Sequence, residues 1–171
     1  VKELLANEPC TKLLEDLIRQ WPECNNPLML GLRGDLSKEL FNQTSQLEYL
    51  RKSYYDYFSD ALILGKQGSK SVMSYPLFDA RKQAYQLFKI KGSIHWLKQS
   101  YQLQLMKKKS RPDAFIDYYA GKTALKLYDN TSDSTWLAKS WTHTTNSLLK
   151  QEENKYKIEI HRQLEEIIHR L

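Results

Sequence analysis

Apolar residues recur every three or four positions along most of this 171-residue chain, and this spacing constrains its fold more than any other feature. The clearest stretch follows the capping-box pair Ser45 and Glu48 and predicts a helix over 46–64. Only six glycines and five prolines interrupt the chain, which argues against a turn-rich β architecture. The sequence therefore predicts an all-α fold, a compact bundle-like domain of about six to seven helices.

Further helices are expected wherever the same spacing lies between turn residues. They are predicted over 11–21, from Asp35 or Ser37, from Ser74 and Pro76, from Ser93, and from Pro112. The run 28–32 is too short for a helix of its own, so we expect it to form buried packing between chain breakers. After the turn at 129–133 we expect a long C-terminal helix, although the threonine-rich segment 142–146 leaves two helices as an alternative.

The length suits a single domain over 1–171, with 1–91 and 92–171 as alternative halves. Two cysteines, Cys10 and Cys24, cannot make a disulfide framework and do not stand at zinc-site spacing. No apolar run is long enough for a membrane span, and no signal peptide opens the sequence. We therefore expect a cytoplasmic protein that does not enter a membrane.

No set of residues points to catalysis. His161, Glu165 and His169 lie near one face of the last predicted helix, but a helical di-iron site needs a second Glu-x-x-His pair. The motif Gly31-Leu-Arg-Gly34 matches the loop of KH domains, which also require a β-sheet that this sequence does not predict. We expect no enzyme activity, no metal, no cofactor and no small-molecule substrate.

Positive charge is concentrated in the middle third of the chain. Residues 66–126 contain 13 basic and 3 acidic residues, whereas 1–65 contains 7 and 10 and 127–171 contains 6 and 7. Aromatic residues alternate with the basic ones, as at Arg81 and Tyr85. Cations neutralise phosphates and exposed rings stack on unpaired bases, so the pattern predicts a non-enzymatic regulator that binds RNA or another single-stranded nucleic acid. The alternative is an adaptor or complex subunit whose basic face binds an acidic protein.

The predicted binding residues are cations for phosphates and aromatic residues for stacking. They are Arg51, Lys52, Tyr55, Lys66, Lys70, Tyr75, Lys82, Lys89, Lys91, Trp96, Lys107, Lys108, Lys109 and Arg111. The competing interpretation is that the aromatic residues face the core and the lysines cover a solvated exterior.

Three motifs in the first half occur in a distinctive order. The step Trp21-Pro22-Glu23-Cys24 ends a predicted helix, the apolar and glycine segment 27–36 follows, and Leu50-Arg51 opens the next long helix. With this order and spacing, residues 12–83 resemble the RNA-chaperone domain of the ProQ/FinO family.

The resemblance implies RNA binding and assigns roles to particular positions. It implies that 27–36 is a crossover between the first helices, and that Arg51 and Tyr57 belong to the binding surface. The family's hairpin motif is replaced by the sequence at 69–73, and Lys66 and Lys70 would act as substitutes in this turn.

Overall fold

The computed structural model describes residues 8–20, 25–110, 112–150 and 157–171. Within these ranges the chain forms eight α-helices and no strand, which confirms the all-α prediction with slightly more helices than expected. The helices are α1 (Glu8–Gln20), α2 (Pro27–Thr44), α3 (Leu47–Lys66), α4 (Lys70–Lys91), α5 (Ile94–Ser110), α6 (Ala114–Thr131), α7 (Ser134–Lys150) and α8 (Lys157–Ile168).

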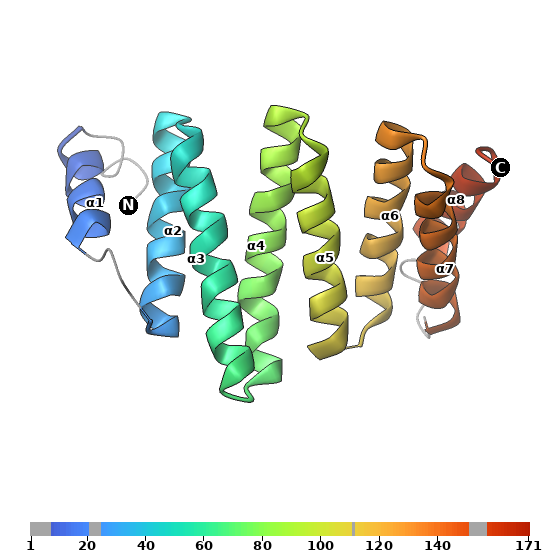
Figure 1. Cartoon of the computed structure of the whole chain (residues 1–171), viewed down its shortest axis with the longest axis horizontal. Helices are drawn as coiled ribbons and strands as arrows, with labels where there is room; N and C mark the ends of the chain where they lie inside the picture. The colour runs from blue at the N-terminus through green and yellow to red at the C-terminus, as the bar shows by residue number, and fades with distance from the viewer. Residues whose placement is uncertain (1–7, 21–24, 111, 151–156) are drawn as a thin grey trace.

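The helices stand side by side in chain order, and from α2 to α7 successive helices run in opposite directions (Figure 1). Most packing is therefore between neighbours in the sequence, as in helical solenoids. The largest apolar cluster reaches from Phe41 of α2 to Trp136 of α7, so it crosses the boundary between the two halves considered above. Among the described helices, none combines the length and apolar character that crossing a bilayer requires.

Helix α2 is where the structure differs most from the prediction. The side chain of Asn26 accepts hydrogen bonds from the backbone N–H groups of Leu28 (3.0 Å) and Met29 (3.4 Å), and Pro27 occupies the first helical turn. The residues that we interpreted as breakers therefore start a helix, and both Gly31 and Gly34 lie inside it. The expected crossover and the KH-type loop are not formed.

Two other helices, α3 and α4, also begin differently from the prediction. Ser45 has φ of 57° and its N–H donates to the carbonyl of Phe41, so it ends α2 instead of capping α3, which follows Gln46. Helix α4 begins at Lys70, which places Pro76 inside the helix and not at its first turn.

The C-terminal segment forms two helices, which corrects the expectation of one long helix. The side-chain amide of Gln163 in α8 donates to Thr144 Oγ1 in α7 at 2.9 Å, across a separation of 19 residues. In one continuous helix these residues would be about 28 Å apart. The threonines that made this region a poor helix are accommodated because Thr142, Thr144 and Thr145 each donate to the carbonyl four residues earlier.

Candidate nucleic-acid interface

A groove lies between α4 and α6, two helices that are separated in the sequence by α5. Its volume is about 170 Å³, and it is lined by Arg81, Tyr85, Tyr119, Lys122 and Thr123. Basic and aromatic side chains thus line this groove together, and none of the described carboxylates is among its lining residues.

The α4 wall of this groove belongs to a continuous stripe of cations and rings. Phe78, Arg81, Lys82, Tyr85 and Lys89 are spaced three or four residues apart, which places them along one side of the helix. The Lys82 ammonium is 4.2 Å from the centre of the Phe78 ring, and that of Lys89 is 5.5 Å from the Tyr85 ring. These distances are those of cation–π contacts.

Neighbouring helices add to the stripe. Lys107 of α5 places its ammonium 4.6 Å from the centre of the Phe78 ring. The guanidinium of Arg81 is 5.0 Å from Phe78 and 5.4 Å from the Tyr119 ring of α6. We refer to the following eight residues as the basic-aromatic cluster: Phe78, Arg81, Lys82, Tyr85, Lys89, Lys107, Tyr119 and Lys122.

Arg81 is the most unusual cation of the basic-aromatic cluster. It is partly buried, and burial lowers the pKa of its guanidinium. Asp79 is near enough to oppose that shift, yet Arg81 forms no ion pair with a carboxylate within the described part of the chain. A guanidinium that has lost much of its water and lies over two rings without an ion pair retains hydrogen-bond donors for an anion.

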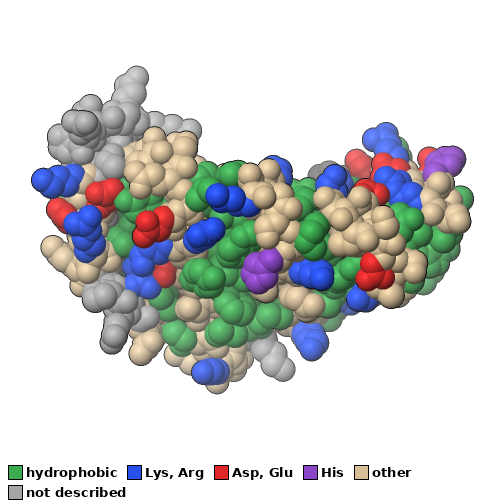
Figure 2. All heavy atoms as spheres, turned by 45° about the horizontal axis from the view of Figure 1, so that its top comes forward, with side chains coloured by type: hydrophobic (Ala, Val, Ile, Leu, Met, Phe, Trp, Pro, Cys, Tyr) green, Lys and Arg blue, Asp and Glu red, His purple; other side chains and the backbone are tan. Residues whose placement is uncertain are grey.

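A second group of predicted residues gathers where α3 begins, α4 ends and α5 begins. Because these helices alternate in direction, Arg51 and Tyr55 lie at the same edge of the array as Lys89, Lys91 and Trp96. Figure 2 shows hydrophobic side chains with lysine and arginine side chains beside them on the face that includes this edge. Tyr55 is 55% exposed, so its ring is open to solvent.

Two of the aromatic residues assigned to the binding surface are buried: Tyr57, which the resemblance implied, and Trp96, which was predicted to stack on bases. Tyr57 is 4% exposed and donates a hydrogen bond to Asp35 Oδ1 at 2.6 Å. Trp96 is buried with its ring edge-on to those of Tyr54 and His95, whose centres are each 5.1 Å away. For these two positions the competing interpretation, that aromatic residues face the core, is correct.

The remaining predicted cations have different surroundings. Lys52 lines a polar cavity together with Glu15 and Glu48, so acidic side chains already accompany it. Lys66 and Lys109 are exposed, as is Tyr75, which lies in a groove between α2 and α4. The side chain of Lys70 and the whole of Arg111 lie outside the described residues.

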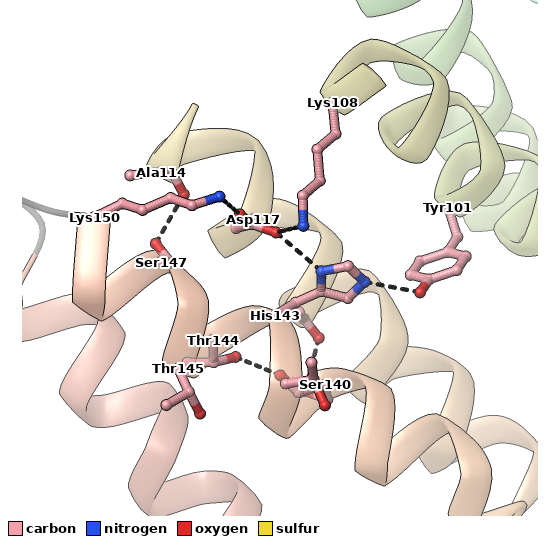
Figure 3. A network of polar contacts seen from close by, with 12 residues as sticks. Tyr101, Lys108, Ala114, Asp117, Ser140, His143, Thr144, Thr145, Ser147 and Lys150 are labelled. Carbon is pink, nitrogen blue, oxygen red and sulfur yellow. Dashed lines mark hydrogen bonds and ion pairs between the residues drawn. The ribbon is translucent and has the colours of Figure 1, made fainter. Parts of the chain in front are cut away.

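Lys108 belongs to a buried polar network that joins three helices (Figure 3). Its ammonium is 2.5 Å from Asp117 Oδ1, and Lys150 of α7 is 2.8 Å from Asp117 Oδ2. His143 Nδ1 is 3.0 Å from Asp117 Oδ1, while His143 Nε2 is 2.9 Å from the hydroxyl of Tyr101. Lys108, predicted to contact phosphate, instead holds the end of α5 against α6.

The charge state of this network follows from its contacts. Burial alone would raise the pKa of Asp117, but hydrogen bonds from Lys108, Lys150 and His143 lower it below its usual value. Asp117, Tyr101 and His143 are all buried, so their arrangement stabilises the packing of α5, α6 and α7.

Three members of the basic-aromatic cluster were missed by the sequence analysis: Phe78, Tyr119 and Lys122. Arg81 and Tyr85 had been noticed only as part of the alternating pattern. The three-and-four spacing from Phe78 to Lys89 was the available signal for α4, whereas nothing in the sequence indicated that α6 would complete the groove.

The sequence matches no protein-family model and no curated protein in the comparisons made with it. Within the described ranges, no three His, Cys, Asp or Glu side chains lie together as a metal site would require. His161, Glu165 and His169 are all exposed on α8 or just after it. The basic-aromatic cluster is therefore the candidate site that the geometry supports best.

Proposed function

We propose that this protein is a non-enzymatic RNA-binding protein and that the basic-aromatic cluster is its RNA contact. The observation that carries the proposal is Arg81, a partly buried guanidinium placed between two rings without a carboxylate partner in the described structure. A phosphate would supply the missing anion and would accept more than one hydrogen bond from the guanidinium.

The other members of the cluster have complementary roles in this proposal. Lys82, Lys107 and Lys122 supply further positive charge for the backbone of the ligand, which gives affinity without sequence preference. The rings of Tyr85 and Tyr119 are only partly buried, so they can stack on unpaired bases. This combination favours single-stranded RNA over a duplex, whose bases are already stacked.

An acidic protein could form ion pairs with the same cations, but it has no unpaired bases to stack on the rings. The resemblance of residues 12–83 to the ProQ/FinO family adds support for RNA as the polyanion. Phe78, Arg81 and Lys82 lie within the segment that carries this resemblance, whereas the other five residues of the cluster lie after it. An acidic partner is the outcome to expect if RNA binding fails.

Fluorescence-anisotropy titration with a labelled single-stranded RNA, a hairpin RNA with a single-stranded loop and a duplex DNA tests the proposal. Four phosphate contacts predict that affinity for the single strand falls by about 50-fold between about 50 and 200 mM salt. The Arg81→Gln variant should bind about tenfold more weakly and show a shallower salt dependence.

Lys139→Gln is the matched control, because Lys139 also lies over a ring, 4.0 Å from Trp136, but on α7 outside the basic-aromatic cluster. Like Arg81→Gln, the Lys139→Gln variant removes one positive charge, but it should leave RNA binding nearly unchanged. Equal weakening by both variants would indicate binding through net charge alone. Absence of RNA binding together with binding of polyglutamate would support the acidic-partner alternative.

A further inference from the structure

A second groove, lined mainly by apolar residues, lies between α2 and α4 with α3 at its base. Its volume is about 480 Å³, within the range of roughly 300–1,000 Å³ that is usual for binding sites. The lining residues are Pro27, Leu28, Gly31, Leu32, Asp35, Asp60, Leu64, Val72, Tyr75 and Pro76. We refer to it as the α2–α4 groove.

The apolar side chains of the α2–α4 groove are exposed to an unusual degree. Leu28 is 71% exposed and Tyr75 69%, and Leu32 and Val72 are each about half exposed. Large apolar side chains that gather on one surface, in place of being scattered singly, are typical of a binding surface.

Asp60 is the feature of this groove that points to a ligand. Its residue is only 8% exposed, and its Oδ1 atom has no hydrogen-bond partner among the described residues. One turn earlier on the same helix, the buried carboxylate of Asp56 receives two bonds from Arg33, at 3.0 and 2.6 Å. Buried carboxylates are normally paired in this way, so Asp60 lacks the partner that Asp56 has.

The charges around the α2–α4 groove specify what that partner can be. Asp35 and Asp60 both line it, whereas no lysine, arginine or histidine among the described side chains does, in a chain whose net charge is +6. Asp35 already accepts a hydrogen bond from Tyr57, which leaves Asp60 as the unpaired carboxylate. The groove therefore repels phosphates and is complementary to a ligand that is apolar and carries one positive charge.

We propose that the α2–α4 groove binds a polypeptide segment of another protein, in which apolar side chains flank one lysine or arginine. The apolar side chains pack on Leu28, Leu32 and Val72, and the cation pairs with Asp60. Burial of the apolar surface supplies affinity, while the single buried charge pair fixes the register of the segment. This site is separate from the basic-aromatic cluster and does not depend on RNA binding.

Selection of displayed peptides provides the probe, since the partner is unidentified. A random 12-residue library is selected on the full chain, and an enriched peptide is synthesised with a fluorescent label. We expect the enriched peptides to share a lysine or arginine between apolar residues. Asp60→Asn should weaken binding of the labelled peptide by at least about 30-fold, and a competing RNA should not displace it.

A double-mutant cycle makes the test specific. Replacing the basic residue of the peptide with methionine should reduce its affinity by the same factor as Asp60→Asn. The two changes together should reduce the affinity little more than either change alone. Leu62→Ser is the control on the protein, because Leu62 is 41% exposed on α3 but does not line the groove. Thermal unfolding of each variant verifies that it is folded.

Three results of the peptide experiments would overturn the proposal. These are a selection without enriched peptides, enriched peptides without a basic residue, and binding that Asp60→Asn leaves unchanged. A concentration-dependent mass in sedimentation that Leu32→Asp abolishes would also overturn it, because it would assign the α2–α4 groove to a second copy of this chain.

Discussion

Gly34 of α2 lies directly against the ring of Tyr57 of α3: a Cβ atom at position 34 would be 2.9 Å from Cε1 of that ring. Tyr57 cannot easily move, because its ring is buried and its hydroxyl is bonded to Asp35. We therefore expect Gly34→Ala to lower the free energy of unfolding by about 1–2 kcal/mol, even though alanine favours the helix. Chemical denaturation measures this change.

Gly31, one turn earlier on α2, provides the matched control. Among the described residues, the one atom that a Cβ there would approach is Asp60 Oδ2, at an ordinary contact distance of 3.4 Å. Gly31→Ala should therefore raise the free energy of unfolding by about 0.5–1 kcal/mol through helix propensity. A loss of stability in both variants would show that the approach of Gly34 to Tyr57 is not the cause.

Asp117 is expected to be a strong contributor to stability. Asp117→Asn should lower the free energy of unfolding by about 3 kcal/mol at pH 7, since it removes a buried charge that binds Lys108, Lys150 and His143. The folded-state pKa of Asp117 is below its unfolded value of about 3.9, so its contribution is present above that pH and is lost as pH falls through the folded-state pKa. Denaturation at pH 7 and pH 3 measures both effects.

Asp129→Asn is the control for this prediction. Asp129 also forms an ion pair, with Arg170 at 2.8 Å, but both side chains are about one-third exposed. Because exposed pairs contribute little, Asp129→Asn should change stability by less than about 1 kcal/mol. Equal losses for Asp117→Asn and Asp129→Asn would contradict the assignment of Asp117 as the centre of the network.

Ionisation of Asp60 should lower the stability of the folded chain, whereas ionisation of Asp117 raises it. Burial raises its pKa to about 6, so between about pH 4 and pH 6 the folded state retains a proton that the unfolded state has released. Stability attributable to Asp60 therefore falls as pH rises through this window. Asp60→Asn should be more stable than the native chain by about 2 kcal/mol at pH 7.5 and equal to it at pH 4.

Thermal unfolding of the native chain and of Asp60→Asn across this pH range measures the difference in their stability. A constant difference between them would show that ionisation of Asp60 is not responsible. A native chain that is more stable than Asp60→Asn at pH 7.5 would show that the carboxylate has a partner in solution.

Tyr119 distinguishes RNA from an acidic protein as the ligand of the basic-aromatic cluster. Tyr119→Leu removes the ring and should weaken binding of single-stranded RNA by about 1–3 kcal/mol with an unchanged salt dependence. Tyr119→Phe retains the ring and should bind normally. Fluorescence anisotropy of both variants at two salt concentrations measures this, and equal binding by the two would exclude stacking at this position.

The sequence alone determined where most helices lie and where positive charge accumulates. Helical spacing after Ser45 located α3 to within two residues at each end, and the helix predicted from Pro112 begins two residues later, at Ala114. These predictions succeeded because helix formation depends on residues a few positions apart, whose spacing is visible in the sequence. Net charge needs no structure at all.

Local signals failed where one pattern serves two purposes. Asn26 and Pro27 are turn residues in one context and helix-starting residues in another, so α2 was predicted to begin too late. The threonines at 142–146 were equally ambiguous, and the contact of Thr144 with Gln163 settled the number of C-terminal helices.

The candidate sites depended on tertiary structure almost entirely. Tyr57 and Trp96 are buried because neighbouring helices cover them, whereas Tyr55, whose ring centre is 6.5 Å from that of Trp96, remains exposed. Arg81 and Tyr119 are 38 positions apart and meet only because α5 returns the chain and brings α6 beside α4. Helical periodicity shows which residues share a side of one helix, but the packing of helices decides which side faces the core, which remains open, and which distant residues share a groove.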